Sequence, residues 1–128
     1  MKEVKTEKSP KALGPYSQAI ESEKLIFCSG QIGIIPNNRE LVSQEIVGQT
    51  KQAIDNLKQI LIAAGSNLDS VLRTEVFLKN MSDFAAMNEV YEKKFSIMPK
   101  PARVTVEVAK LPKDALIEIS CIAYKKSL

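Results

Sequence analysis

Residues 99–120 read PKPARVTVEVAKLPKDALIEIS, and they contain two strand-like runs with charged residues inside them. In the first run valines alternate with polar residues, and alternate side chains of a strand point to opposite faces. The residues in this run are Arg103, Val104, Thr105, Val106, Glu107 and Val108. We therefore expect helices to cover one face of a sheet, while the other face presents an arginine and carboxylates.

The second run, residues 116–124, repeats the alternation. Its apolar face is formed by Ile117, Ile119, Cys121 and Ala123. Its opposite face carries Leu116, Glu118, Ser120, Ile122 and Tyr124. Charged groups held on the rigid backbone of strands favour a functional site at this place.

The composition is that of an ordinary globular protein. We expect a single domain over residues 1–128, with 45% hydrophobic and 26% charged residues. The net charge is only +3 and the basic residues are scattered, which argues against nucleic acid or a membrane surface as the partner. The start, residues 1–8, alternates lysine with glutamate and is predicted to be a solvated end. It resembles neither a secretory signal nor a transit peptide, and we expect a cytoplasmic protein.

Cysteine and histidine usage excludes several kinds of site. Cys28 and Cys121 lie in apolar runs without a CxxC spacing, which favours reduced core residues over a metal site. The chain has no histidine, so mechanisms that need an imidazole base are excluded, including Ser/His/Asp and Cys/His pairs. The commonest ligand of catalytic zinc is missing as well.

The remaining elements follow from turn signals and periodicity. Short strands are predicted within residues 16–20 and 24–29, joined by a hairpin across residues 21–23. Another strand is predicted at 70–79, with Leu72, Val76 and Leu78 on one face. A helix is predicted from Ser43, as its N-cap, to Gly65, with a polar face on solvent. That polar face consists of Gln49, Lys51, Gln52, Asp55 and Lys58. Ser82 is predicted to cap a second helix, with buried Phe84, Met87, Tyr91 and Phe95.

Two helices cover only one face of a sheet with five or six strands. The predicted uncovered face carries Arg103, Leu116, Glu118, Ile122 and Tyr124. Because this face is partly apolar and partly charged, we expect it to be buried by self-association, with clefts at the seams between copies.

Four motifs resemble one known family over about residues 9–123. They are GPYSQAI at 14–20, SGQIG at 29–33, NEVYEKKF at 88–95 and PARVTVEVAKLPKDALIEI at 101–119. Together they are similar to the YjgF/YER057c/UK114 proteins, also called RidA, the reactive intermediate (enamine/imine) deaminases. The resemblance implies a chorismate-mutase-like α+β fold of the bacillar type, a mixed β-sheet with two helices on one face, in a homotrimer. The three sheets would form a barrel with clefts between subunits.

The resemblance also implies a reaction and its residues. The reaction is hydrolysis of 2-imino acids to 2-oxo acids and ammonia, without metal or cofactor. Arg103 matches the arginine that holds the substrate carboxylate, for which a planar guanidinium is well suited. Glu118 matches the glutamate that positions or activates water, and partial burial raises a glutamate pKa towards a useful range. The binding residues implied are Tyr16, Ser29, Gly30, Asn88, Arg103 and Thr105.

The chain departs from the usual PARSCVEV pattern, because Val104 and Thr105 stand where Ser and Cys are usual. The resemblance assigns the imine nitrogen to the backbone carbonyl at position 105, so this change is compatible with activity. It removes a thiol and bears on substrate preference.

Structural readings of the same residues stay open. Arg103 can anchor a salt bridge with Glu107 or Glu118 inside an oligomer, and Glu107 shares the strand parity of Glu118. Tyr16 can serve only to hold its loop in place by packing its ring. Ser29 can be present only because serine is common before a glycine in turns.

Three functional classes follow. The first is the imine hydrolase acting on 2-iminobutyrate and 2-iminopropanoate. The second is a regulatory trimer that binds small 2-oxo acids without turnover, for which Arg103 alone suffices. The third, an RNA-cleaving or translation-inhibiting activity, is disfavoured by the absence of histidine and of a basic stripe.

Overall fold

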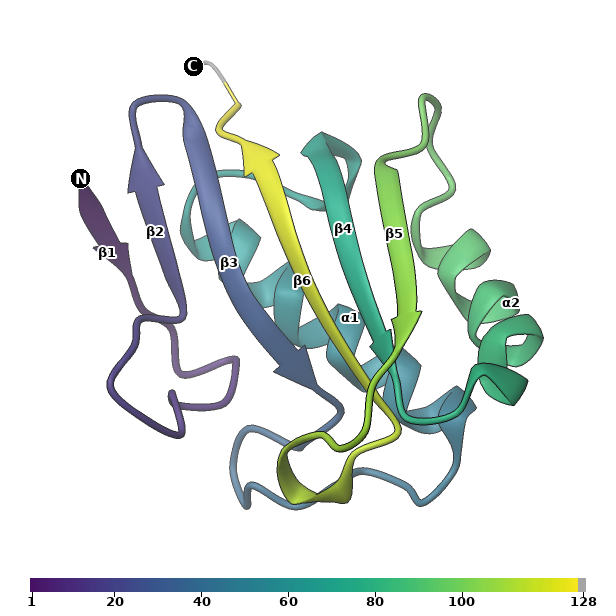
Figure 1. Cartoon of the computed structure of the whole chain (residues 1–128). Coiled ribbons are helices and arrows are strands. Elements are labelled where there is room, and N and C mark those ends of the chain that lie inside the picture. The colour runs from purple at the N-terminus through teal and green to yellow at the C-terminus, as the bar shows by residue number, and fades with distance from the viewer. Residues whose placement is uncertain (127–128) are drawn as a thin grey trace.

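The computed structural model describes residues 1–126 and contains one mixed β-sheet and two α-helices (Figure 1). The strands are β1 (Lys2–Val4), β2 (Ala19–Ser22), β3 (Leu25–Ile32), β4 (Val71–Leu78), β5 (Ala102–Glu107) and β6 (Ile117–Tyr124). The helices are α1 (Ile46–Ala63) and α2 (Phe84–Lys94), with short 3₁₀ turns at Leu68–Ser70, Met81–Asp83 and Pro112–Asp114. This confirms the α+β class and the expected order of elements from β2 onwards.

The strands lie in the order β1-β2-β3-β6-β4-β5. All neighbouring strands are antiparallel except β4 and β5, which α2 connects as a parallel pair. A parallel pair needs such a crossover connection, whereas the β2–β3 hairpin needs only the turn at Glu23, where φ is +55°. The chain thus places β6 near the middle of the sheet and β5 at its edge.

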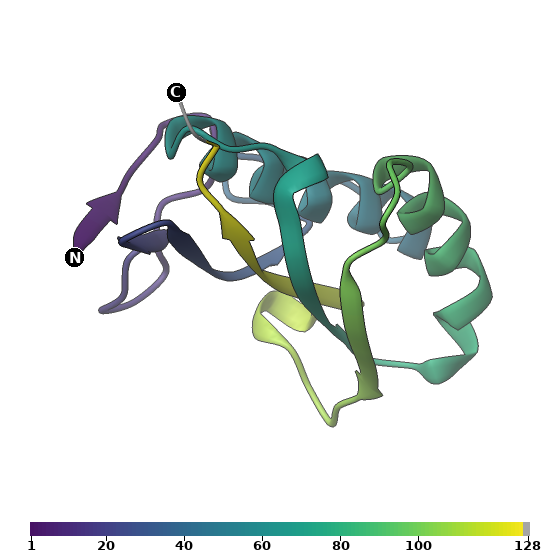
Figure 2. The ribbon, with the colours of Figure 1, turned by 90° about the horizontal axis from the view of Figure 1, so that it is seen from above.

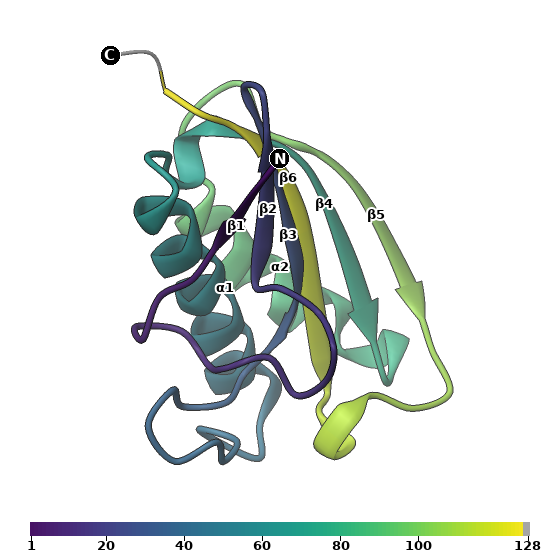
Figure 3. The same cartoon turned by 90° about the vertical axis from the view of Figure 1, so that its left-hand side faces the viewer.

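Both α-helices lie on the same face of the sheet, and within residues 1–126 no α-helix lies over the other face (Figures 2 and 3). The main core lies between α1, α2 and the covered face. The apolar face predicted for residues 117–123 is confirmed as part of it, since Ile117, Ile119, Cys121 and Ala123 are all buried there. The α-helices therefore form a second layer on one face of the sheet, and the opposite face has no such layer within residues 1–126.

Helix α1 has the predicted buried stripe and the predicted end. The stripe residues Ile46, Thr50, Ala53, Ile54, Leu57, Ile60, Leu61 and Ala64 are all buried. Gly65 follows the helix with φ +82°, a conformation that favours glycine. Two details were wrong. The helix begins at Ile46 with Glu45 as the N-cap residue, and Gln49 is buried because its amide bonds to Ser43 O and Leu116 N.

The amino-terminal end was also predicted wrongly. Instead of a solvated end, Lys2–Val4 forms strand β1 beside β2, and Val4 is buried. A three-residue strand with a single buried side chain is too short to produce a periodic pattern.

Three further corrections concern residues 70–95. A bulge between Val71 and Arg73 turns Val71 inward and leaves Leu72 exposed. Helix α2 begins after the 3₁₀ turn with Asp83, and not Ser82, at its N-cap position. Met87, Tyr91 and Phe95 are buried as predicted, together with Val90, whereas Phe84 at the helix start is 39% exposed.

The largest correction concerns β5, where Arg103 faces the helices. Arg103 lies opposite Thr74 of β4, which pairs in turn with Cys121 of β6, and both of these side chains are buried on the covered face. Glu118 pairs with Phe77 and is on the uncovered face, as predicted. The prediction that Arg103 and Glu118 share a face is therefore wrong, because strand alternation gives two faces but does not say which one receives helices. Leu116 was misplaced too, since it precedes β6 and packs against the main core.

Candidate functional site

Glu118, Gly30, Ser29 and Tyr16 come together on one side of the molecule, and we call them the Glu118 cluster. Glu118 lies on β6, and Gly30 lies in a β3 bulge between Cys28 and Gln31. A side-chain carbon at position 30 would overlap the Glu118 carboxylate, so only glycine lets the carboxylate lie against this backbone. The bulge and the missing side chain together fix where the carboxylate sits.

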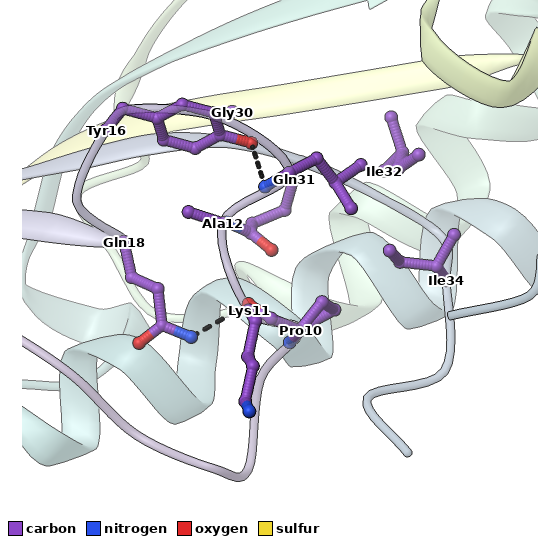
Figure 4. Close-up of a pocket in the computed structure, with 10 residues that line it drawn as sticks. Pro10, Lys11, Ala12, Tyr16, Gln18, Gly30, Gln31, Ile32 and Ile34 are labelled. Atoms are coloured by element: carbon purple, nitrogen blue, oxygen red, sulfur yellow. Dashed lines mark hydrogen bonds between the residues drawn. The ribbon is translucent and has the colours of Figure 1, made fainter. Parts of the chain in front are cut away.

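A loop before β2 carries Tyr16 to the same place. Ser29 Oγ donates to Ser17 O at 2.6 Å, and Ser29 N donates to Gln18 O at 2.9 Å. Tyr16 and Gly30 line one small cavity, where the Tyr16 hydroxyl accepts a hydrogen bond from Leu13 N at 3.1 Å (Figure 4). Tyr16 is 49% exposed, so its ring borders the cavity rather than filling the core.

Gln18 organises this loop and was not predicted as a site residue. Its buried side chain accepts from Thr6 N and donates to Thr6 O and Pro10 O, and it lines the cavity beside Tyr16 (Figure 4). The only signal in the sequence was its place in the GPYSQAI motif. Its contacts join residues far apart in the chain, which no local pattern reveals.

The electrostatic feature of this cluster is the Glu118 carboxyl. Desolvation by burial raises its pKa above the ordinary value of 4.5, because burial disfavours the charged form. The side chain is only half-buried, so it remains open to a small molecule or water. A carboxyl whose pKa is raised towards the pH of the reaction is better suited to accept and return a proton than an ordinary one.

Arg103, Asn88 and Thr105 lie together at the other edge of the sheet, between β5 and α2, and with Phe84 and Tyr91 we call them the Arg103 cluster. The guanidinium carbon of Arg103 lies 4.7 Å from the Tyr91 ring centroid and 5.6 Å from that of Phe84. None of the ion pairs within residues 1–126 involves Arg103. Its charge is thus held by aromatic rings and is available to an anion.

Asn88 and Thr105 are the other predicted residues of this cluster. Asn88 is half-buried on α2, four residues after Phe84 and three before Tyr91, so it shares their helix face. Thr105 is on the same face of β5 as Arg103, and its buried hydroxyl has no hydrogen-bond partner within the described chain. A buried hydroxyl without a partner is uncommon and leaves hydrogen-bonding capacity for a ligand.

The two clusters do not meet within one chain. Glu118 is on the uncovered face of a central strand, and Arg103 is on the covered face of an edge strand. Glu107, the alternative candidate for the catalytic glutamate, is instead on the covered face, where it accepts a hydrogen bond from Met81 N at 2.7 Å. A single copy therefore offers two incomplete halves of the predicted site.

Within residues 1–126, no group of three or more His, Cys, Asp or Glu side chains is arranged to hold a metal ion. In the same part of the chain, neither helix has the length and apolar character needed to span a membrane.

Comparison with known proteins identifies the family of this chain. Residues 6–125 match the family described as Endoribonuclease L-PSP. The chain belongs to the YjgF/RidA family. This YjgF/RidA protein is 54% identical to a RutC family protein of Pyrococcus horikoshii, over 98% of this chain and 100% of that one. It is 43% identical to the mouse protein named 2-iminobutanoate/2-iminopropanoate deaminase, over 97% and 91% of the two chains.

Solved structures give the same result for the fold. The structure of Escherichia coli TdcF with bound serine superposes on this YjgF/RidA protein with a TM-score of 0.92. The two sequences are 35% identical, and the match covers 98% of this chain and all of TdcF. The family resemblance inferred from the four motifs is thereby confirmed.

Proposed function

We propose that this protein hydrolyses 2-imino acids, with 2-iminobutyrate and 2-iminopropanoate as substrates, to 2-oxo acids and ammonia. The observation that carries the proposal is the pair of complementary half-sites. One holds an arginine that forms no ion pair within residues 1–126, and the other holds a glutamate with a raised pKa. A 2-imino acid needs both, since it has a carboxylate to bind and a C=N bond that water must attack.

The halves would be joined between copies of the chain in a homotrimer. Apolar side chains are exposed on the uncovered face, among them Phe27 (42%), Val106 (39%) and Tyr124 (43%). A second copy laid against this face would bury them, and it would bring its own Arg103 cluster to the Glu118 cluster of its neighbour. The trimeric order rests on the family resemblance.

In the proposed reaction the Arg103 guanidinium binds the substrate carboxylate through paired N–H donors. The Glu118 carboxylate takes a proton from the attacking water, whose oxygen forms a bond to the imine carbon. That proton passes to the nitrogen and gives a carbinolamine, with OH and NH2 on the same carbon. The proton of this hydroxyl group then passes to the nitrogen through Glu118, the C–N bond breaks, and neutral ammonia leaves as the C=O bond forms. The overall balance is imino acid plus water to 2-oxo acid plus ammonia.

A second candidate is a trimer that binds 2-oxo acids or amino acids without turnover. It is favoured by the related TdcF structure, which holds serine. The Arg103 cluster would suffice for it, so the role of Glu118 separates the two functions.

The test uses two variants, Arg103→Ala and Glu118→Gln, prepared separately and refolded together. The assay is ammonia release from 2-iminobutyrate generated by a threonine dehydratase. If each site combines Arg103 of one copy with Glu118 of its neighbour, two inactive variants mixed in equal amounts regain about a quarter of wild-type activity, the random fraction of intact sites in closed rings.

Two results would contradict the proposal. No acceleration by a folded wild-type oligomer leaves the binding trimer as the better account. Activity in the wild type without any recovery in the mixture would instead place both groups in the same copy.

A further inference from the structure

Arg103 does not lie freely on the surface but is held against two rings of α2. Its guanidinium carbon is 4.7 Å from the centroid of Tyr91 and 5.6 Å from that of Phe84. An arginine on an aromatic face is attracted by the negative face of the ring. A planar guanidinium against a ring leaves its N–H edge free, and this edge is what a carboxylate binds in a bidentate manner.

The Tyr91 ring is itself held in place. Its hydroxyl forms a 2.6 Å hydrogen bond with the hydroxyl of Thr74, and both side chains are buried. The ring centroid of Phe95 lies 4.5 Å from that of Tyr91. Thr74 is the direct partner of Arg103 in the β4–β5 register. The hydroxyl group that bonds to Tyr91 therefore belongs to the residue next to Arg103 on the neighbouring strand.

Desolvation raises the Tyr91 pKa, so the phenol stays protonated at neutral pH, while the bond to Thr74 and the charge of Arg103 act in the opposite direction. The neutral phenol keeps its hydrogen bond to Thr74 intact over the working pH range.

We infer that Tyr91, anchored by Thr74, is a positioning residue that orients Arg103 for the carboxylate of the ligand. Phe84 supports the guanidinium from the exposed side. The inference rests on the proposed function for the class of ligand, a small 2-imino or 2-oxo acid. It assigns a role in ligand binding to a tyrosine that would otherwise be counted only as core.

The consequence is a lower cost of binding. A free arginine side chain loses rotamer freedom when it grips a carboxylate, whereas Arg103 has lost much of it before the ligand arrives. Immobilising one such side chain corresponds to about a two- to tenfold change in Kd. The gain applies to a carboxylate and not to a neutral group at the same position.

The experiment measures the Kd of the assembled protein for 2-oxobutyrate and for its amide, 2-oxobutanamide. Tyr91→Leu is expected to weaken 2-oxobutyrate about two- to tenfold while the amide changes little. Tyr91→Phe keeps the ring and is expected to recover most of the affinity for 2-oxobutyrate. Phe84→Leu removes an exposed ring, tests the second support without opening the core, and is expected to give a smaller loss in the same direction.

The matched control is Met87→Leu, because Met87 is fully buried on the same helix and is not one of the two rings beside Arg103. It is expected to change neither Kd. Thr74→Val and Tyr91→Phe remove the same hydrogen bond, so the double variant should resemble either single variant.

Equal weakening of acid and amide by Tyr91→Leu would mean a structural role only and would overturn the inference. So would unchanged selectivity for the acid in both Tyr91→Leu and Phe84→Leu. A wild type that binds 2-oxobutyrate with the expected selectivity but hydrolyses no imino acid would overturn the deaminase proposal and leave this inference standing. A wild type that does not distinguish acid from amide would overturn both.

Discussion

The two clusters hold their charged side chains by different means. Glu118 lies on a central strand against the bare backbone of Gly30, whereas Arg103 lies on an edge strand and is held by the side chains of Phe84 and Tyr91. Desolvation raises the pKa of the Glu118 carboxyl, and Arg103 forms no ion pair with a carboxylate in the part of the chain that the structure describes. We infer that the backbone at Gly30 fixes the position of the proposed proton acceptor in the Glu118 cluster. In the Arg103 cluster, aromatic rings fix the position of the group proposed to bind the ligand carboxylate.

The sharpest test of this contrast is Glu118→Gln. Removing the group proposed to take a proton from water is expected to lower kcat by about 10² to 10⁴ while the Kd for 2-oxobutyrate changes little. The measurement is ammonia release from 2-iminobutyrate, with ligand titration alongside it.

The matched control is Glu107→Gln, since Glu107 has the same side chain but is on the other face of the sheet, bonded to Met81 N. It should retain near wild-type kcat. An equal loss in both variants would contradict the assignment of Glu118.

A smaller effect is expected from Gly30→Ala. The added methyl group would overlap the Glu118 carboxylate and push it away from its place. A displacement of about 1 Å at a reacting group typically costs about a hundredfold in rate. Because the loss acts through Glu118, the double variant Gly30→Ala/Glu118→Gln should be no slower than Glu118→Gln alone.

Gly14→Ala provides the control, because a methyl group there meets only the Tyr16 ring at an ordinary 3.5 Å. Additive losses in the Gly30/Glu118 double variant would show that Gly30 acts independently of the carboxylate.

The third prediction concerns pH. Glu118 must be ionised to take a proton from water, so kcat/KM is expected to fall as the pH drops through its raised pKa, above the ordinary 4.5. This acid limb should be missing from any residual activity of Glu118→Gln. A midpoint at or below 4.5 would contradict the role of burial.

The smallest expected effect is on stability. A carboxyl whose pKa is raised in the folded state binds its proton more tightly there than in the unfolded chain, so stability falls as the pH rises from the ordinary value through the raised one. Above the ordinary pKa the wild type carries this cost, and Glu118→Gln does not. Urea unfolding at fixed protein concentration should show the variant to be the more stable at pH 7, with the difference shrinking towards pH 4.

Much of the fold was readable from local patterns. The buried stripe of α1, the stop at Gly65 and the alternation in β6 all depend on neighbours within a few residues, and all are confirmed. The failures at Gln49 and Leu72 come from a hydrogen bond to a distant residue and from a bulge in the pairing with β6. The positions of Glu118 and Gly30 beside each other likewise need the β3–β6 register, which the motif match anticipated but periodicity did not.

The sequence by itself determined the family, the order of elements from β2 onwards and, away from the β-bulges, which side chains of a strand share a face. Only the tertiary structure decided which face that is. Alternation in residues 103–107 is the same whether the valines or the arginine face the helices. The choice was made by the parallel register of β5 against β4, which sets Arg103 beside buried Thr74 and within reach of the rings on α2.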